Sequence, residues 1–148
     1  LTQRRTHPMA IRVKRVEHLG LIVEDVKEAA ALYEKLFGLK ATLFEEHSRD
    51  GGTLRIAFSG AGNTLLEFLA TDAPSGPIAD AIKRVGGPHL HHMAVEVEDI
   101  QEAVRELKEM GVRIAVEPRE GSRGSTIAFL HPKDTAGTLI ELVQPKAE

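Results

Sequence analysis

The chain has 148 residues, no cysteine and a formal net charge of −3 at pH 7. This length is typical of one domain, or of two half-domains that share one core. The acidic charge, the absence of tryptophan and an aromatic content of 4% argue against nucleic acid as a partner, because phosphate binding needs basic patches and base stacking needs aromatic rings. Without cysteine, metal chemistry is confined to histidine and carboxylates, and the composition is typical of the cytoplasm.

The N-terminal segment "LTQRRTHP" has no apolar stretch of the kind found in signal peptides. We interpret residues 1–8 as a tag remnant or disordered extension before Met9, and we therefore discount His7 as a ligand. No apolar run approaches the roughly 20 residues that a membrane span requires. We expect residues 9–148 to form a single domain without a membrane segment.

The first half begins with a strand and continues with a helix. Residues 13–23 alternate in polarity and are rich in β-branched side chains, which predicts a strand. Asp25 and Glu28 have capping-box spacing, an apolar stripe follows, and Gly38 is suited to the helix C-terminus. Three further strands are predicted near residues 40–46, 53–59 and 64–70, so the first module spans about 11–70.

The second half repeats this pattern 74 positions later. The segment "VEHLGLIVEDVKEA" from Val16 has a near-copy, "LHHMAVEVEDIQEA", from Leu90. The repeat predicts a helix capped by Asp99 and Glu102, and three strands near residues 112–117, 125–130 and 138–143. The second module spans about 89–145, and a linker of about 71–88 carries a short helix at 77–85.

These elements predict an α+β fold. Four strands alone enclose too little core, so two tandem βαβββ modules should form one open, barrel-like mixed sheet. An internal repeat of this length defines the architecture.

Four side chains keep the same spacing as the repeat. His18 and His92 are 92 − 18 = 74 positions apart, and Glu67 and Glu141 are 141 − 67 = 74 apart. The two glutamates lie among apolar residues, where an unpaired carboxylate would be costly. Pseudo-two-fold symmetry would bring all four around one divalent cation. Two nitrogens and two oxygens favour an octahedral ion such as cobalt, manganese, nickel, iron or magnesium, with zinc as an alternative.

Other polar residues are weaker candidates. In "HLHHM", His91 should face away from His92 and His89 should lie in a loop, which predicts surface positions for both. A polar hairpin around His47 is either a solvated turn or a flap over the site. "EGSRGS" at 120–125 offers donors for a phosphate, but a plain hairpin turn is the preferred interpretation.

The residues and motifs resemble the methylmalonyl-CoA epimerase family of the vicinal oxygen chelate superfamily over residues 13–144. The marks that carry this resemblance are "VEHLGLIV", "GNTLLEFL", "SGPIADAI", "LHHMAVEVEDI" and "GSRGSTIAFLHPKDTAGTLIEL". The last of these discriminates best, because glyoxalases of the superfamily usually have a short "DPDG"-like turn before the final ligand strand.

The resemblance implies a metal-dependent isomerase that interconverts (2R)- and (2S)-methylmalonyl-CoA. His18, Glu67, His92 and Glu141 would be the metal ligands, with cobalt as the first choice of ion. Glu141 would be one acid/base. Ile56 stands where some relatives have glutamate, which leaves Glu67 or a carboxylate of the flap (Glu45, Glu46 or Asp50) as the second acid/base. Because some relatives have glutamine at the position that matches Glu67, Glu67 ranks first as a ligand and second as a base.

The same reasoning leaves alternative functions open. The nearest is a glyoxalase-type lactoylglutathione lyase, which would need glutathione recognition. An extradiol dioxygenase is disfavoured, because that chemistry uses one carboxylate and three open positions on iron. From another class, a metal-independent binding or resistance protein would be expected to lack the four ligands. We expect a small-molecule acyl-CoA substrate and a homodimer in the cytoplasm.

Overall fold

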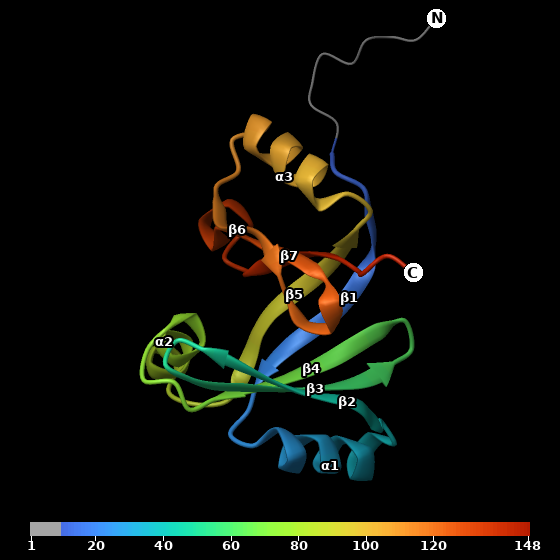
Figure 1. Ribbon diagram of the computed structural model, residues 1–148, viewed down its shortest axis with the longest axis vertical. Coiled ribbons are helices and arrows are strands. Elements are labelled where there is room, and N and C mark those ends of the chain that lie inside the picture. The colour runs from blue at the N-terminus through green and yellow to red at the C-terminus, as the bar shows by residue number, and fades with distance from the viewer. Residues whose placement is uncertain (1–9) are drawn as a thin grey trace, which may run out of the picture. The chain divides into compact units, whose positions relative to one another are not determined.

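The computed structural model describes residues 10–148, so the predictions for residues 1–8 and His7 lie outside the described part of the chain. Eight strands form one mixed sheet in the order β2-β3-β4-β1-β5-β8-β7-β6 (Figure 1). The α-helices within residues 10–148 are α1 (Val26–Phe37), α2 (Pro77–Val85) and α3 (Ile100–Glu109). None of them has the length and apolar character needed to cross a bilayer. The predicted α+β class is confirmed.

The strand bounds confirm the β–α–β–β–β order of elements in each half. The first four strands are β1 (Val13–Ile22), β2 (Ala41–Arg49), β3 (Gly52–Ala61) and β4 (Thr64–Thr71). The last four are β5 (His89–Val97), β6 (Ile114–Glu120), β7 (Thr126–Leu130) and β8 (Ile140–Gln144). Short 3-10 turns, η1 (Ser122–Gly124) and η2 (Pro132–Asp134), follow β6 and β7.

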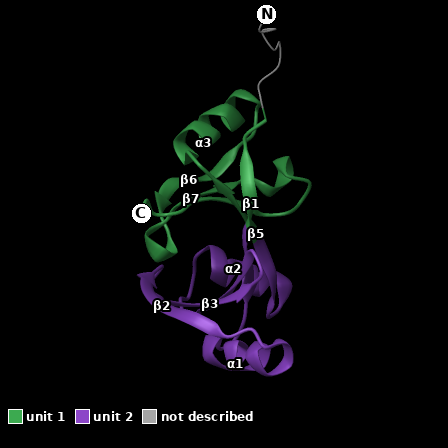
Figure 2. Ribbon diagram, turned by 90° about the vertical axis from the view of Figure 1, so that its right-hand side faces the viewer, with its two compact units in different colours: residues 1–16, 93–148 green, residues 17–92 purple. Residues whose placement is uncertain are grey.

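The described residues fall into two compact units (Figure 2). One, which we call the first unit because it contains the first half of the repeat, contains residues 17–92 and is drawn in purple as unit 2 in Figure 2. The other, which we call the second unit, contains residues 93–148 and the N-terminal segment up to Val16. Each unit is described below by itself.

The first unit buries apolar side chains on both faces of its strands. On one face, α1 packs through Val26 and Ala30 against Phe68 and its neighbours. On the other face, α2 contributes Ala81 to a cluster that includes Phe58. Because Phe58 and Phe68 are almost completely buried, and each aromatic ring removed from water stabilises a fold by a few kcal/mol, these two clusters hold the strands that carry the site.

The caps of α1 explain where the helix begins and ends. The Asp25 side chain accepts a hydrogen bond from the Glu28 backbone N–H at 2.9 Å. At the other end, Gly38 has φ 70°, a left-handed conformation that glycine adopts without a Cβ clash, and its N–H donates to the Glu34 carbonyl. The predicted capping residue and stop are therefore both confirmed.

The hairpin between β2 and β3 is longer and tighter than predicted. The strands continue to Arg49 and resume at Gly52, so only Asp50 and Gly51 form the turn, with φ 57° and 82°. Two residues with positive φ are typical of a tight hairpin turn that suits the twist of the strands. His47 consequently belongs to β2 and not to a polar loop, because the strand pairing extends past it.

The second unit packs its own helix against one face of its strands. Ile100, Val104 and Leu107 of α3 join Leu142 and neighbouring strand residues in one buried cluster. The Asp99 side chain caps α3 by accepting from the Glu102 N–H at 3.1 Å. This repeats the arrangement around α1, as the 74-residue offset predicts.

An ion pair anchors the loop that leads to β8. Arg113 donates through Nε and Nη2 to the two Asp134 carboxylate oxygens, at 2.9 and 3.0 Å, and its backbone N–H also donates to Oδ2. These hydrogen bonds lower the pKa of Asp134 to about 2 and raise the pKa of Arg113. The "HPKD" segment thus ties η2 to the start of β6.

Candidate metal centre

The two predicted glutamates have equivalent partners in their strand ladders. In the first unit, β1 runs parallel to β4 and Gly20 lies opposite Glu67. In the second unit, β5 runs parallel to β8 and Ala94 lies opposite Glu141. Gly20 and Ala94 are themselves 94 − 20 = 74 positions apart. Each histidine precedes that small residue by two positions, so it shares a face with it.

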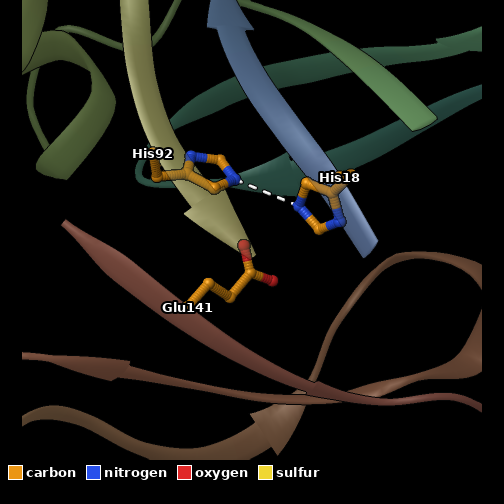
Figure 3. Close-up of side chains that lie close together, drawn as sticks. All are labelled: His18, His92 and Glu141. Atoms are coloured by element: carbon orange, nitrogen blue, oxygen red, sulfur yellow. Dashed lines mark hydrogen bonds between the residues drawn. The ribbon is translucent and has the colours of Figure 1, made fainter. Parts of the chain in front are cut away.

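Three of the four predicted ligands converge within the first unit. His18 Nε2 and His92 Nε2 lie 3.1 Å apart, and the hydrogen bond between them is drawn in Figure 3. Glu67 Oε1 lies 3.3 Å from His92 Nε2 and 3.7 Å from His18 Nε2. All three residues are at most 5% exposed. Two imidazole nitrogens and one carboxylate oxygen therefore face the same point in a buried environment.

This donor set fits a divalent cation. Two imidazole nitrogens that bind one ion at about 2.1 Å and at right angles to each other are separated by about 3.0 Å. The observed separation of 3.1 Å between the two Nε2 atoms matches that geometry. Nitrogen and carboxylate oxygen together suit first-row transition ions better than calcium.

Gly20 makes room for His92. A Cβ atom placed on Gly20 would lie only 2.1 Å from His92 Cε1, far inside van der Waals contact. Sequence reasoning predicts that small neighbours leave room beside each histidine. The space left by Gly20 is filled by the ring of His92, which lies 74 positions from His18, on a different strand.

Glu141 is buried in the second unit at 5% exposure. On β8 it lies between Ala94 of β5 and Phe129 of β7. Glu67 has an equivalent setting, between Gly20 and Phe58. Each carboxylate thus projects beside one small residue and one phenylalanine, and the similarity of setting supports the symmetry that the repeat predicts.

Sequence reasoning missed the residues that precede the two histidines. Glu17 is 1% exposed, and its Oε1 lies 2.5 Å from His18 Nδ1. His91 Nδ1 lies 2.9 Å from His92 Nδ1. Period-two alternation predicts opposite faces for neighbouring strand residues, so it gave no signal for either contact. The prediction of a surface position for His91 is wrong, because the residue is half-buried and contacts the His92 ring.

The other histidine of "HLHHM" also differs from its prediction. His89 is the first residue of β5 and does not lie in a loop. It is half-buried, and its Nδ1 is 2.8 Å from the Gly87 carbonyl oxygen. Its ring also lies edge-on to that of His91, with centroids 6.0 Å apart, so His89 approaches the candidate ligand His92 only through His91.

The strand register separates the carboxylates of the predicted flap. Glu45 lies opposite Ile56, which shares a face with Phe58 and hence with Glu67. Glu46 is one position further along β2, so it faces the other way, where it pairs with Arg55. Glu45 is therefore the flap carboxylate on the face of Glu67, and it contacts His47 Nε2 at 2.8 Å.

The remaining β3 positions on this face are apolar. Leu54, Ile56 and Phe58 are all at most 5% exposed, and none of them can transfer a proton. Asp50 lies in the tight turn at the end of the hairpin. Consequently β3 offers no acid/base on the face of Glu67.

The "EGSRGS" segment forms the turn between β6 and β7. The Gly121 N–H donates to the Ser125 carbonyl, while the Ser125 N–H and hydroxyl both donate to the Ser122 carbonyl. Arg123 and Gly124 have positive φ values of 55° and 68°, as the tight reversal requires. These donors already have partners inside the turn, which agrees with the preferred interpretation as a hairpin turn.

Known proteins share both the sequence pattern and the fold. The family model described as "Glyoxalase/Bleomycin resistance protein/Dioxygenase superfamily" matches residues 15–142. An ethylmalonyl-CoA/methylmalonyl-CoA epimerase of Cereibacter sphaeroides is 35% identical over 134 residues, which cover 89% of this chain and 98% of that protein.

Solved structures give the same result. The crystal structure of methylmalonyl-CoA epimerase from Mycobacterium tuberculosis superposes with a TM-score of 0.80 at 30% identity, covering 99% of this chain and 95% of that one. A methylmalonyl-CoA epimerase in complex with methylmalonyl-CoA and NH4+ gives a TM-score of 0.81 at 27% identity, covering 92% of this chain and 97% of that chain.

The chain therefore belongs to the Glyoxalase/Bleomycin resistance protein/Dioxygenase superfamily. Within that superfamily, the relatives that it resembles in sequence and in structure are methylmalonyl-CoA epimerases. The resemblance predicted from the motifs is confirmed.

Proposed function

We propose that this protein is an isomerase that interconverts (2R)- and (2S)-methylmalonyl-CoA by moving the proton on carbon 2 of the acyl group. The observation that carries the proposal is the convergence of His18 Nε2, His92 Nε2 and Glu67 Oε1 at 3.1 to 3.7 Å in a buried site. Relatives that are named as epimerases of this substrate support the choice of reaction.

The metal ligands in this proposal are His18, Glu67, His92 and Glu141, and cobalt is the first candidate ion. Manganese, nickel, iron, magnesium and zinc are the alternatives. Glu141 is included because its ladder position in the second unit repeats that of Glu67. In this proposal, His18 and His92 of the first unit and Glu141 of the second unit would contribute to the same ion.

The reaction requires a weakly acidic proton to leave one face of carbon 2 and a proton to arrive on the other. A divalent ion held by these residues would supply positive charge, which would lower the cost of the negative charge that develops on the substrate. Glu141 is the acid/base that accepts the proton from one face. Glu67, the equivalent carboxylate of the other half, is the candidate that donates a proton to the opposite face.

The apolar surroundings of these carboxylates favour proton transfer. Phe58 and Phe129 lie opposite Glu67 and Glu141 in the strand ladders. Apolar neighbours exclude bulk water from the place where the proton moves, so the proton passes between the carboxylate and the substrate directly and not through solvent. The strand register separates Glu45 from Glu46, so Glu45 ranks next to Glu67 as the second acid/base.

The test of the proposed reaction is the loss of α-deuterium from labelled methylmalonyl-CoA to water. Metal-stripped protein should release little label, and protein reloaded with cobalt should release it rapidly. The hemithioacetal of glutathione and methylglyoxal serves as the control substrate and should remain unchanged. Absence of release in both metal states, or turnover of the control, would refute the assignment.

The role of Glu141 is tested by Glu141→Gln, which preserves the size of the side chain but cannot accept a proton. Loss of one acid/base group typically costs about 10²–10⁴-fold in rate, and we expect a loss of that size in α-deuterium release. The control is Glu98→Gln, at an exposed position just before α3, which should keep the wild-type rate. Normal release from Glu141→Gln would contradict the assignment.

Two further predictions concern the protein in solution. We propose a homodimer, which light scattering coupled to size-exclusion chromatography measures directly. We also propose a cytoplasmic location, in agreement with the absence of cysteine from the sequence. Fractionation of the source cells, followed by detection of the protein, tests that location.

A further inference from the structure

The residues that precede the two histidines form unequal contacts with them. Glu17 and His91 occupy equivalent positions of the repeat, 91 − 17 = 74 apart. Each contacts the Nδ1 atom of the histidine that follows it, Glu17 with its carboxylate at 2.5 Å and His91 with its own Nδ1 at 2.9 Å. In each case the Nε2 atom remains directed towards the candidate metal centre.

A carboxylate and an imidazole impose different constraints on the neighbouring ring. An ionised carboxylate only accepts hydrogen bonds, so His18 Nδ1 must carry the hydrogen and Nε2 keeps its lone pair. Between two neutral imidazoles, either ring can be the donor. The contact with His91 therefore leaves both tautomers of His92 available, whereas Glu17 selects the tautomer of His18 whose lone pair faces the centre.

The burial of the Glu17 carboxylate costs free energy unless a hydrogen-bond partner compensates for the lost hydration. Glu17 is 1% exposed, and a buried carboxylate needs strong partners to offset its lost hydration. His18 Nδ1, which lies 2.5 Å from Glu17 Oε1, supplies one such partner. An acceptor of this kind on the outer nitrogen orients a metal-bound imidazole and makes its inner nitrogen a better donor.

We infer that Glu17 is a positioning residue that fixes the orientation and tautomer of His18 and thereby makes His18 the stronger of the two imidazole ligands. This inference deepens the proposed function, on which it rests, because it names a residue that prepares the metal centre without contacting the substrate. It distinguishes Glu17 from His91, which occupies the equivalent position in the other half of the repeat.

The test compares Glu17→Ala, which removes the acceptor, with Glu17→Gln, which retains an oxygen at the same distance but has no charge. Cobalt is titrated into metal-free protein and its dissociation constant is measured by competition with a chelator. Loss of an outer partner of a ligand typically weakens metal binding about 10–100-fold, and we expect a loss in this range for Glu17→Ala. Glu17→Gln and His91→Ala should each weaken cobalt binding by less than Glu17→Ala does.

A second readout separates positioning from general support of the fold. The ¹⁵N chemical shifts of the His18 ring report which nitrogen carries the hydrogen, and they should show hydrogen on Nδ1 in the wild type and in Glu17→Gln. In Glu17→Ala both tautomers should be populated. The control is Glu46→Gln in the same unit, because the Glu46 side chain is 69% exposed and pairs only loosely with Arg55 at 3.4 Å.

The outcomes distinguish this inference from the proposed function. Wild-type cobalt affinity and an unchanged His18 tautomer in both Glu17 variants would overturn the positioning role, even if α-deuterium release is metal-dependent. Should Glu17→Ala fail to fold, unchanged affinity in Glu17→Gln together with an unchanged cobalt absorption spectrum would overturn it. Wild-type protein that binds cobalt but releases no label would refute the proposed reaction and leave the Glu17 effect on affinity intact.

Discussion

The two halves of the repeat place their donors alike but surround them differently. In the first unit, the face that carries Glu67 is covered by α2, and the Phe58 ring and its aliphatic neighbours are buried there. In the second unit, the face that carries Glu141 has a smaller buried cluster of Ala94, Ile127 and Val143. The opposite face is covered by a helix in both units. The strand register is thus the same in the two halves, while the side-chain packing around it differs.

This difference shows how a symmetric scaffold can support an asymmetric reaction. Equivalent ladder positions fix where the two carboxylates emerge, since parallel pairing places each of them beside one small residue. Neighbouring side chains then decide what each donor does. His18 has a carboxylate on its outer nitrogen and His92 has an imidazole, so the same position acquires different chemistry in each half.

The largest expected effect compares the two cores. Phe68 and Leu142 are 142 − 68 = 74 positions apart and are 0% and 1% exposed. Phe68→Ala should lower the free energy of unfolding by about 3–5 kcal/mol and Leu142→Ala by about 2–5 kcal/mol, because each leaves a cavity. Urea denaturation of metal-free protein measures both values. A nearly neutral Leu142→Ala would mean that the cluster under α3 contributes less to the free energy of unfolding than the cluster under α1.

A smaller effect tests the space between strands. Gly20→Ala adds a methyl group that would collide with the His92 ring, and overpacking of this kind typically costs about 1–3 kcal/mol. We also expect weaker cobalt binding, because relief of the collision must move His92. The counterpart, Ala94→Gly, should cost about 0.5–1 kcal/mol through added backbone freedom and should keep its cobalt affinity. Equal affinities in the two variants would show that the close approach at Gly20 is unimportant.

The helix caps should behave alike in the two halves. Asp25 and Asp99 each accept one hydrogen bond from the backbone N–H three residues later, at 2.9 and 3.1 Å. Replacement of either aspartate by alanine should cost about 1 kcal/mol. Thermal and urea unfolding of the two single variants measure this. A difference of more than about twofold between the two losses in unfolding free energy would show that the two caps are not equivalent.

The smallest expected effect on stability comes from an ion pair that only the second half contains. Asp134 pairs with Arg113, whereas Gly60, the residue 74 positions earlier, has no side chain. The pKa of Asp134 is lowered to about 2, below the value of about 3.9 for an unfolded chain. Its contribution to stability is therefore complete above about pH 5 and is lost as the pH falls from about 4 towards 2.

Asp134→Asn checks this pH dependence. The variant should be less stable than the wild type near neutral pH, and the gap should close as the pH falls towards 2. Urea denaturation at a series of pH values measures the gap. A gap that stays constant with pH would indicate that Asp134 contributes through packing and not through its charge.

Features that depend on local sequence were predictable. The capping boxes, Gly38 and the short helix from Pro77 all have signals within a few residues, and the structure confirms them. The four candidate ligands stand out in the sequence because each half of the repeat carries one histidine and one glutamate at matching positions. The sheet order β2-β3-β4-β1-β5-β8-β7-β6 has the mirrored arrangement expected of two such modules.

Features that depend on side-chain reach and register were not predictable. Which flap carboxylate shares a face with Glu67 follows only from the pairing of Glu45 with Ile56. The contact between Glu17 and His18 joins neighbours on one strand, which alternation alone assigns to opposite faces. Similarly, the sequence marks Gly20 as small but does not reveal that the ring of His92 fills its space.

The most direct test of the account is the number of cobalt ions bound per chain and its change in single variants. If the two halves supply ligands to one centre, metal-free protein should take up one cobalt per chain, and His18→Ala and His92→Ala should each abolish that uptake. Glu67→Gln and Glu141→Gln should each weaken binding of the same single ion. Two ions per chain, or full uptake after loss of either histidine, would contradict the shared centre.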